Sequence, residues 1–502
     1  MLRILILLFF PLLSFSQSPR PNIILFIVDD MGWQDTSVPF WKEETPLNKL
    51  YRTPNMARLA SEGVKFTDAY VTPVCTPTRI SLITGMNAAH HGVTNWTSPW
   101  KNNSTDVPDA QFGPANWKYN GLSPNPYPNT VQATPFPQLL KDAGYFTIHV
   151  GKAHWGSSGT PGSNPYNLGF MVNIAGHSAG HPQSYLSEDN YGNISGKAGI
   201  QAVPDLQEYH GSGVFLTEAL TLEAIKALDN PIRRKQPFFL YMGHYAIHVP
   251  LMADKRYFDR YLSLGLDSNE AKYATLIEGM DKSLGDLMDY LKQTGQDKHT
   301  VIIFMSDNGA LSTKPSRSGP AHTQNLPLRA GKGSVYEGGI RNPLLIKWPG
   351  KAPAGKTCSI LTGVEDIFPT IMEMAGVRAY KTAQQRDGQS LVPALRNPDI
   401  TQSDKSLIWH YPNKWIANDG PGINYHSAIR KGYWKLVYNQ RTGKKELYDL
   451  KSDIGETNDI ANAHPELVRS LVKELGSRLK AWKAPMPLLK ATGEPLAFPG
   501  EE

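Results

Sequence analysis

The chain has 502 residues, which is long enough to bury a large core and predicts two or more domains. Its 51 basic and 45 acidic residues leave a net charge of +6. This excess is too small and too scattered to form a nucleic-acid-binding surface, so we expect no polynucleotide partner.

The N-terminus has the pattern of a secretory signal peptide. Arg3 precedes an apolar run over residues 4–13, and the small residues Ser14 and Ser16 follow it. We therefore predict a signal over residues 1–16 and an exported protein, either periplasmic or secreted. A membrane-spanning helix needs about 20 apolar residues, which neither this run nor a later segment supplies. We expect no stable membrane insertion after the signal is cleaved.

The next elements predict the start of an α/β fold. An apolar, β-branched run over residues 23–28 ends abruptly at Asp29 and Asp30, as in a buried parallel strand that presents carboxylates at its carboxyl end. A capped helix over residues 53–63 and a strand over residues 64–70 follow. The simplest arrangement of these three elements is a βαβ unit.

A helix is predicted directly after this second strand. Thr76 is a typical helix-capping residue, Pro77 suits the first turn and Gly85 suits the exit, which places Cys75 just outside the helix N-terminus. The free amides and the dipole at such an end attract an anion, and Arg79 lies one turn further on the same face. We therefore expect a negatively charged group to bind beside Cys75.

Cys75 and Cys358 are the only cysteines in the chain, which is unusual for an exported protein of this size. A disulfide between them is one possibility, although it would block the residue at the helix end. If Cys75 has a chemical role instead, Cys358 is expected to be a small, buried, apolar residue.

Residues 95–137 are rich in Asn, Pro, Trp and Gly, and we expect them to form a long surface insertion. Trp96, Trp100 and Trp117 lie in this stretch. They are interpreted either as platforms that stack on a sugar ring or as residues that pack the loop.

Alternating helices and strands continue after the insertion, and polar residues recur where the strands stop. The predicted helices cover residues 135–143, 214–228 and 269–294, and the predicted strands cover 145–150, 238–242 and 300–305. The polar residues at the strand ends are Lys152, His154, His244, His248, Asp307 and Asn308. Because the carboxyl ends of strands converge in an open doubly wound sheet, we expect these side chains to share one site.

The pattern changes beyond about residue 380. Short alternating runs over residues 407–411, 428–430, 434–438 and 446–450 predict a small antiparallel sheet, closed by a helix over residues 465–482. We predict a catalytic domain over residues 17–380 and a smaller α+β domain over residues 381–502.

Asp29, Asp30, Asp307 and Asn308 offer only oxygen ligands, which suits a hard cation. Calcium is the first choice and magnesium remains open, whereas zinc would prefer nitrogen or sulfur. A double Asp at one strand end is more often a cap or a turn. The Asp-Asn pair at a second strand end favours the metal site.

The segment Cys75-Thr76-Pro77-Thr78-Arg79 resembles the signature of the type I sulfatases of the alkaline phosphatase superfamily, in which the Cys is oxidised to formylglycine (3-oxoalanine). Further blocks resemble that family in its own order, over residues 27–32, 151–154, 248–250, 306–309 and 331–341. The resemblance extends from about residue 20 to about residue 450. It implies a large doubly wound mixed sheet flanked by helices, and a maturation enzyme that acts on Cys75.

The resemblance also implies a role for each site residue. It implies one calcium ion held by Asp29, Asp30, Asp307, Asn308 and the modified Cys75. A hydrated aldehyde at position 75 has two hydroxyls, of which one attacks the sulfur of a sulfate ester and the other then expels sulfate. Arg79 would help to acidify the attacking hydroxyl, Lys152 and Lys332 would hold the sulfate oxygens, His248 would protonate the leaving alcohol, and His154 would take a proton from the hemiacetal.

Several other histidines have more than one possible role. The segment Tyr245-Ala246-Ile247 replaces the Pro-containing approach that the family usually has before His248, which leaves His244 as a rival. His177, His181, His322 and His410 are interpreted as substrate contacts or as structural residues. The pair His90-His91 is expected to be structural.

These features together predict an exported, calcium-dependent sulfatase. Its predicted substrate is a sulfated carbohydrate, such as algal ulvan, a galactan or a host glycan. The alternatives are a phosphodiesterase or phosphonate hydrolase on the same scaffold, and a catalytically dead, calcium-dependent glycan-binding protein.

Overall fold

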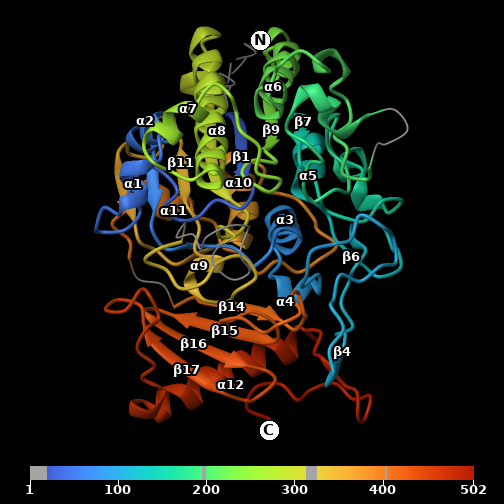
Figure 1. Cartoon of the computed structure of the whole chain (residues 1–502), viewed down its shortest axis with the longest axis vertical. Helices are drawn as coiled ribbons and strands as arrows, with labels where there is room; N and C mark the ends of the chain where they lie inside the picture. Colours follow the sequence, from blue (N-terminus) through green and yellow to red (C-terminus); the bar gives the residue numbers. More distant parts are fainter. Residues whose placement is uncertain (1–19, 195–198, 312–324, 402–403, 502) are drawn as a thin grey trace, which may run out of the picture.

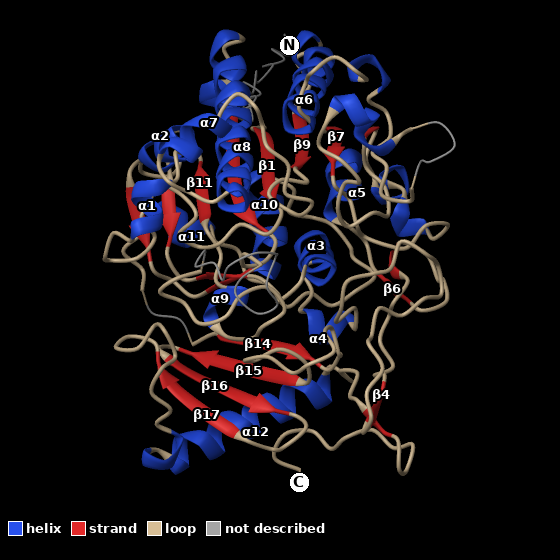
Figure 2. Cartoon of the chain, viewed as in Figure 1, coloured by secondary structure: helices blue, strands red, loops and turns tan. Residues whose placement is uncertain are grey.

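The computed structural model describes residues 20–194, 199–311, 325–401 and 404–501. The predicted signal over residues 1–16 and the candidate His322 lie outside these residues. The larger part of the molecule is a sheet flanked by helices, and a small antiparallel sheet lies across its lower end (Figures 1 and 2). Among the described residues, no helix is both long and apolar enough to cross a membrane.

An eight-stranded sheet forms the centre of the larger part, in the order β12-β2-β11-β10-β1-β9-β7-β8. Its strands are β1 (Asn22–Val28), β2 (Val64–Phe66), β7 (Phe146–Gly151), β8 (Val172–Ile174), β9 (Phe238–Gly243), β10 (Thr300–Ser306), β11 (Leu344–Lys347) and β12 (Lys356–Cys358). All neighbours run parallel except β11, which is antiparallel to both β10 and β2. β1 is buried along its whole length, as its apolar run predicts.

Helices cover both faces of this sheet. One face carries α2 (Pro54–Glu62), α6 (Leu216–Arg233), α7 (Phe258–Ser263) and α8 (Ser268–Gln293), and the other carries α3 (Cys75–Thr84), α5 (Phe136–Asp142), α10 (Ile367–Met374) and α11 (Val392–Arg396). Alternate residues of β1 point to opposite faces, so Phe26 enters the first core and Leu25 the second. The predicted fold class, α/β with a doubly wound mixed sheet, is confirmed.

The strand predicted over residues 64–70 is wrong as a single element. β2 stops at Phe66, and β3 (Ala69–Tyr70) pairs in a separate two-stranded sheet with β13 (Thr362–Gly363). The chain leaves the large sheet at Asp68, whose carboxylate accepts hydrogen bonds from Arg341 and Arg430. β2 is also separated from β1 by β10 and β11, so the two strands do not form an adjacent βαβ unit.

The predicted surface insertion is partly structured and partly buried. It contains β4 (Phe112–Gly113), β5 (Gly121–Ser123) and β6 (Thr130–Gln132). Trp117 is only 1% exposed and donates from Nε1 to Asp106 at 2.7 Å, so it packs the core and is not a sugar platform. Trp100 is 56% exposed, and Trp96 is half-buried.

The small antiparallel sheet follows the predicted order. Its strands are β14 (Ser406–Tyr411), β15 (His426–Lys431), β16 (Trp434–Asn439) and β17 (Lys445–Asp449), and α12 (Pro465–Ala481) packs against one face. The other face shares an apolar cluster with the larger part, in which Trp409 and Val437 lie with Tyr70 and Val74. A short strand, β18 (Leu488–Leu489), pairs with β4. The domain boundary at residues 380 and 381 stays a prediction.

The described residues also form three short α-helices, α1 (Pro46–Leu50), α4 (Ala88–His91) and α9 (Glu337–Ile340), and several 3-10 turns. A buried ion-pair cluster ties α9 to the small sheet. Lys435 of β16 is 0% exposed, and its Nζ lies 2.8 Å from carboxylate oxygens of both Glu337 and Glu456. Loss of the ammonium would leave the buried carboxylate of Glu456 without its ion pair to Lys435 and would leave Glu337 paired, among the described residues, with Arg341 alone.

We expect Lys435→Met to lower the free energy of unfolding by about 3–5 kcal/mol, because it breaks a fully buried ion pair. Lys431→Met is the matched control, since Lys431 on the neighbouring strand pairs with Glu474 at 2.9 Å in an exposed position. That control should cost about 1 kcal/mol or less. Urea unfolding followed by tryptophan fluorescence measures both, and equal losses would contradict the prediction.

Candidate active site

The carboxyl ends of four central strands lie at one edge of the sheet. Val28 of β1 pairs with Ser306 of β10, and Gly243 of β9 pairs with both Ile27 and Gly151. The polar residues that follow these strands therefore emerge side by side. Gly151 has φ +92°, and a Cβ there would lie 2.0 Å from the Gly243 carbonyl oxygen, so only glycine fits this turn before Lys152.

Cys75 is the first residue of α3, which corrects the prediction that it precedes the helix. Val74 is the N-cap residue and makes no side-chain cap. Thr76 does not cap the helix because its hydroxyl accepts a hydrogen bond from the Thr97 amide at 3.1 Å and lies 3.3 Å from Nε2 of His154. Gly85 ends the helix in the left-handed conformation, as predicted.

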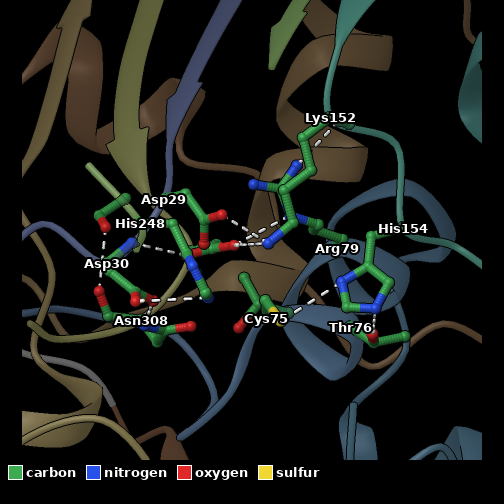
Figure 3. Close-up of polar contacts among 12 residues, drawn as sticks. Asp29, Asp30, Cys75, Thr76, Arg79, Lys152, His154, His248 and Asn308 are labelled. Carbon is green, nitrogen blue, oxygen red and sulfur yellow. Dashed lines mark hydrogen bonds and ion pairs between the residues drawn. The ribbon is translucent and has the colours of Figure 1, made fainter. Parts of the chain in front are cut away.

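Three buried ion pairs surround Cys75, and Figure 3 labels one of them, between Asp29 and Lys152. Asp29 accepts from Lys152 at 2.6 Å, Asp30 accepts from Lys332 at 2.6 Å, and Asp307 accepts from Arg79 at 2.9 Å. The side chains of these six residues are between 0% and 7% exposed. Each buried cation in the cluster therefore has a carboxylate partner.

Neighbouring carboxylates keep Lys332 and Arg79 protonated, and burial keeps the Cys75 thiol neutral. Burial alone would lower the pKa of Lys332, but Asp30 outweighs it and holds the pKa above its usual value. Asp307 has the same effect on Arg79. Burial raises the pKa of the Cys75 thiol, although Lys152 and Lys332 oppose the shift. Since the thiolate is the nucleophilic form of cysteine, the unmodified side chain is poorly suited to attack.

Two buried oxygen atoms in the cluster have no hydrogen-bond partner within the described part of the chain. They are Oδ1 of Asp29 and Oδ1 of Asn308. The amide nitrogen of Asn308 donates to Asp30 at 2.7 Å, which orients its oxygen away from that carboxylate. Burial and the nearby Asp307 raise the pKa of Asp29, as expected where carboxylates crowd. A hard cation would satisfy both oxygens, so the residues fit such an ion.

His154 is held as a neutral base that faces Cys75. Its Nε2 lies 3.0 Å from the carbonyl oxygen of Thr97, which can only accept, so Nε2 carries the hydrogen. Nδ1 is then free of hydrogen and lies 3.4 Å from the Cys75 sulfur. Burial lowers the pKa of His154 well below its usual value, and the charge on Lys152 lowers it further.

His248 lies on the opposite side of Cys75 from His154 (Figure 3), with Nε2 3.6 Å from Asp30. Its Nδ1 donates to the Val249 carbonyl at 2.9 Å. The ring of His181 stacks on it with centroids 5.5 Å apart, which brings His181 to the site. The hydroxyl of Tyr185 lies 2.8 Å from the His248 carbonyl and 2.7 Å from that of Tyr245, so it holds this loop in place.

Most of the remaining histidines have structural partners. His244 bonds to Ser283 of α8 at 2.8 Å and lies in the helix-covered core, away from Cys75. His410 bonds to Ser427 and Pro485, and His91 bonds to Ser81 of α3. The His177 carbonyl accepts from the amide of His154, and its own Nε2 has no partner in the described part of the chain.

Both cysteines are free, so the disulfide alternative is wrong. Cys358 is 0% exposed and lies in an apolar cluster, as expected for a small apolar residue. The sequence did not point to the roles of Tyr185 or of the Thr97 carbonyl. The Thr97 contact is made by a backbone carbonyl, which every residue has, so the type of residue at position 97 does not predict it.

Comparison with known protein families gives two matches. The model described as Sulfatase matches residues 21–377. A second model, described as N-sulphoglucosamine sulphohydrolase, C-terminal, matches residues 331–484. Together they cover almost all of the residues that form the sheet and the site.

Individual proteins are similar over most of their length. A sulfatase of Formosa agariphila is 29% identical, and the match covers 95% of this chain and 92% of that protein. The N-acetylgalactosamine-6-sulfatase of Mus musculus is 30% identical over 92% of this chain and 88% of its own. The crystal structure of Ps i-CgsB in complex with k-i-k-neocarrahexaose is 28% identical, with a TM-score of 0.70, over 92% of this chain and 93% of that chain.

Proposed function

Since this chain belongs to the sulfatase family and is therefore a sulfuric ester hydrolase, we propose that it removes sulfate from a sulfated polysaccharide or its oligosaccharides. The observation that carries the proposal is the buried cluster around Cys75. There the ammonium groups of Lys152 and Lys332 and the guanidinium group of Arg79 lie near the N-terminus of α3. The names of two similar proteins point to carbohydrates: one is an N-acetylgalactosamine-6-sulfatase, and the other was solved with neocarrahexaose.

We further propose calcium and a formylglycine at position 75. Asp29, Asp30, Asp307 and Asn308 would hold the ion together with the modified Cys75, and the ion would supply positive charge beside the sulfate. The hydrated aldehyde would supply a hydroxyl nucleophile and a second hydroxyl through which sulfate leaves. A maturation enzyme that oxidises Cys75 is then a required partner of the chain.

The two lysines are proposed to hold the sulfate oxygens. Lys152 and Lys332 are each anchored to a carboxylate at 2.6 Å, so their ammonium groups are already positioned before substrate binds. Preorganised charges of this kind stabilise the negative charge that develops as the S–O bond breaks. Arg79 donates from Nε to Asp307 and from Nη1 to the Lys152 carbonyl, so it helps to position Asp307 and Lys152.

The two histidines are proposed to move protons on opposite sides of position 75. Nδ1 of His154 is the atom that accepts a proton from a hydroxyl at that position, since its Nε2–H is already committed to Thr97. Nε2 of His248 is the atom that would give a proton to the departing alcohol, and because Nδ1–H is donated to Val249, this step requires the doubly protonated ring. Burial lowers the pKa of His248 well below its usual value, and the Asp30 carboxylate 3.6 Å from Nε2 opposes that shift and favours the protonated ring. Tyr185 fixes the loop that carries His248. His181, which stacks on His248, and His177, whose carbonyl accepts from the His154 amide, are proposed to contact the sugar.

A screen of defined sulfated oligosaccharides with product analysis tests the proposal. Mass spectrometry of the peptide that spans Cys75 is run on the same preparation, because an unconverted enzyme is expected to be inactive. We expect stoichiometric sulfate and a desulfated sugar from at least one algal galactan, ulvan or host-glycan fragment. A fully converted preparation that binds such fragments without releasing sulfate would instead support a catalytically dead glycan-binding protein.

A comparison of three aryl esters separates the proposal from a phosphodiesterase or phosphonate hydrolase. We expect 4-nitrophenyl sulfate to be hydrolysed with a higher kcat/KM than bis(4-nitrophenyl) phosphate and 4-nitrophenyl phenylphosphonate. All three esters carry a single negative charge, so the difference measures the preference for sulfur over phosphorus and not a preference for charge. Faster release from the phosphorus esters would overturn the assignment. We also propose that the chain is exported and then periplasmic or secreted, which cell fractionation checks.

A further inference from the structure

A second polar pocket lies outside the cluster around Cys75. Its volume is about 470 Å³, within the range of small-molecule sites. It lies between residues 33–42 and 65–68 of the larger part and residues 433 and 450–454 beside the small sheet. None of the residues that line it belongs to the proposed catalytic or metal-binding set.

The pocket is positively charged. Lys42, Lys65 and Lys451 line it, and Asp68 is the only acidic residue among the described residues of its wall. Asp68 is already paired with two arginines, because its Oδ1 accepts hydrogen bonds from Arg341 at 2.8 Å and from Arg430 at 2.7 Å. It therefore cannot neutralise the three lysines.

The lysines themselves lack strong carboxylate partners within the described part of the chain. Nζ of Lys65 donates to the Pro39 carbonyl at 2.6 Å and has no ion pair. Lys42 pairs only with Glu43, at 3.7 Å, and both side chains are well exposed. Nζ of Lys451 lies 5.7 Å from the ring centroid of Tyr433. The pocket thus presents ammonium groups that an added anion would satisfy.

Aromatic side chains line the same pocket. Tyr433 is 51% exposed although it is a large ring, and Trp41 is half-buried. Rings of this kind offer an apolar face with a polar edge, on which the C–H face of a sugar can pack. A small inorganic anion would use the lysines but would leave these rings exposed to solvent.

We propose that this pocket binds a sulfated sugar unit, as a second glycan site separate from the catalytic centre. Lys42, Lys65 and Lys451 would contact the sulfate groups, and Tyr433 and Trp41 would pack against the ring. The choice of sulfate as the anion rests on the proposed function, whereas the pocket, its charge and its rings do not. Such a site would hold a polymer near the enzyme between cleavage events.

The binding of a heparin-derived hexasaccharide to the full chain tests the proposal. Titration calorimetry is carried out on the Cys75→Ala background, so that the probe is not hydrolysed, with neutral maltohexaose as the comparison sugar. We expect Tyr433→Ala combined with Lys451→Glu to weaken binding of the hexasaccharide by about tenfold or more. We also expect binding to weaken as salt rises, because exposed charges are screened.

Two variants serve as matched controls. Tyr166→Ala removes a tyrosine of equal exposure, 52%, and Lys473→Glu makes the same charge change on an exposed residue of α12. Both should bind the hexasaccharide as the Cys75→Ala protein does. The proposal is overturned if the Tyr433 and Lys451 variant binds as tightly as the controls, if Lys473→Glu weakens binding equally, or if no binding occurs at low salt.

The outcome of the hexasaccharide titration can be distinguished from the outcome of the test for sulfatase activity. Failure of the unaltered enzyme to release sulfate from any substrate would overturn the sulfatase proposal and leave the hexasaccharide titration unchanged. The combined Tyr433→Ala and Lys451→Glu change is also made in the protein that retains Cys75. Unchanged hydrolysis of 4-nitrophenyl sulfate by that variant shows that the surface changes leave the fold intact.

Discussion

Cys75→Ala is expected to lower kcat/KM for sulfate release by about 10³-fold or more, because it removes the proposed nucleophile. The side chain lies at the N-terminus of α3 with the ammonium of Lys152, the guanidinium of Arg79 and the ring of His154 around it. The neighbouring groups alone would retain some binding of sulfate but no atom that can attack sulfur. Steady-state kinetics on 4-nitrophenyl sulfate and on the cognate oligosaccharide measure the loss.

Cys75→Ser gives a sharper test of the chemistry at this position. Its hydroxyl oxygen could form a bond to sulfur while the alcohol leaves with a proton from His248, but a serine sulfate ester has no second hydroxyl to expel the sulfate. We therefore expect at most one turnover, with one sulfuryl group left on the peptide that spans residue 75. Mass spectrometry after incubation with substrate detects this adduct. Continuous turnover by a serine enzyme would contradict the aldehyde mechanism.

The second large expected effect is the stabilisation of the folded protein by calcium. A ligand that binds only the folded state at one hundred times its Kd stabilises that state by about 2.7 kcal/mol. We expect calcium to raise the Tm of the protein relative to an EDTA-treated sample, because Asp29 and Asn308 each hold a buried oxygen that lacks a partner. Differential scanning calorimetry reads this effect without any measurement of activity.

Variants and other metals sharpen the calcium test. Asn308→Ala removes one of the two partnerless oxygens and should reduce the calcium-dependent rise in Tm, whereas Asn129→Ala, in a loop of the insertion, should not. Magnesium is expected to give a smaller rise, since it tolerates irregular geometry less well than calcium. Equal Tm values with EDTA and with calcium would contradict the calcium proposal, and a larger rise with zinc would replace calcium by zinc.

Elements with a strong local pattern were predicted well. The apolar run of β1, the long amphipathic helix α8 and the four strands of the small sheet all lie within a few residues of their predicted bounds. The convergence of Asp29, Lys152 and Asp307 was also predictable, because parallel strands deliver their carboxyl ends to one edge. Such features depend on neighbours in sequence or on a general rule of sheet topology.

Features that depend on distant partners were not predictable. The break at Asp68 arises because Arg341 and Arg430 capture its carboxylate, and both residues lie more than 250 positions away in the sequence. Trp117 donates to Asp106 within the insertion, but the apolar cluster that buries it includes residues of α3 and β10, which the sequence of the insertion does not reveal. The capping role given to Thr76 was wrong because the helix begins at Cys75, which places Thr76 inside the first turn, where its hydroxyl accepts from the Thr97 amide.

The burial of Cys75 also sets an order of events. The residue is 4% exposed, the segment before it bonds to Trp409 and Gly333, and the ion pairs around it come from β7, β10 and the segment that holds Lys332. A maturation enzyme cannot reach a side chain enclosed in this way. The proposed oxidation therefore belongs to the interval after Cys75 has been synthesised and before the later strands have closed over it. A chain that folds faster than it is oxidised would be trapped as an intact but inactive protein.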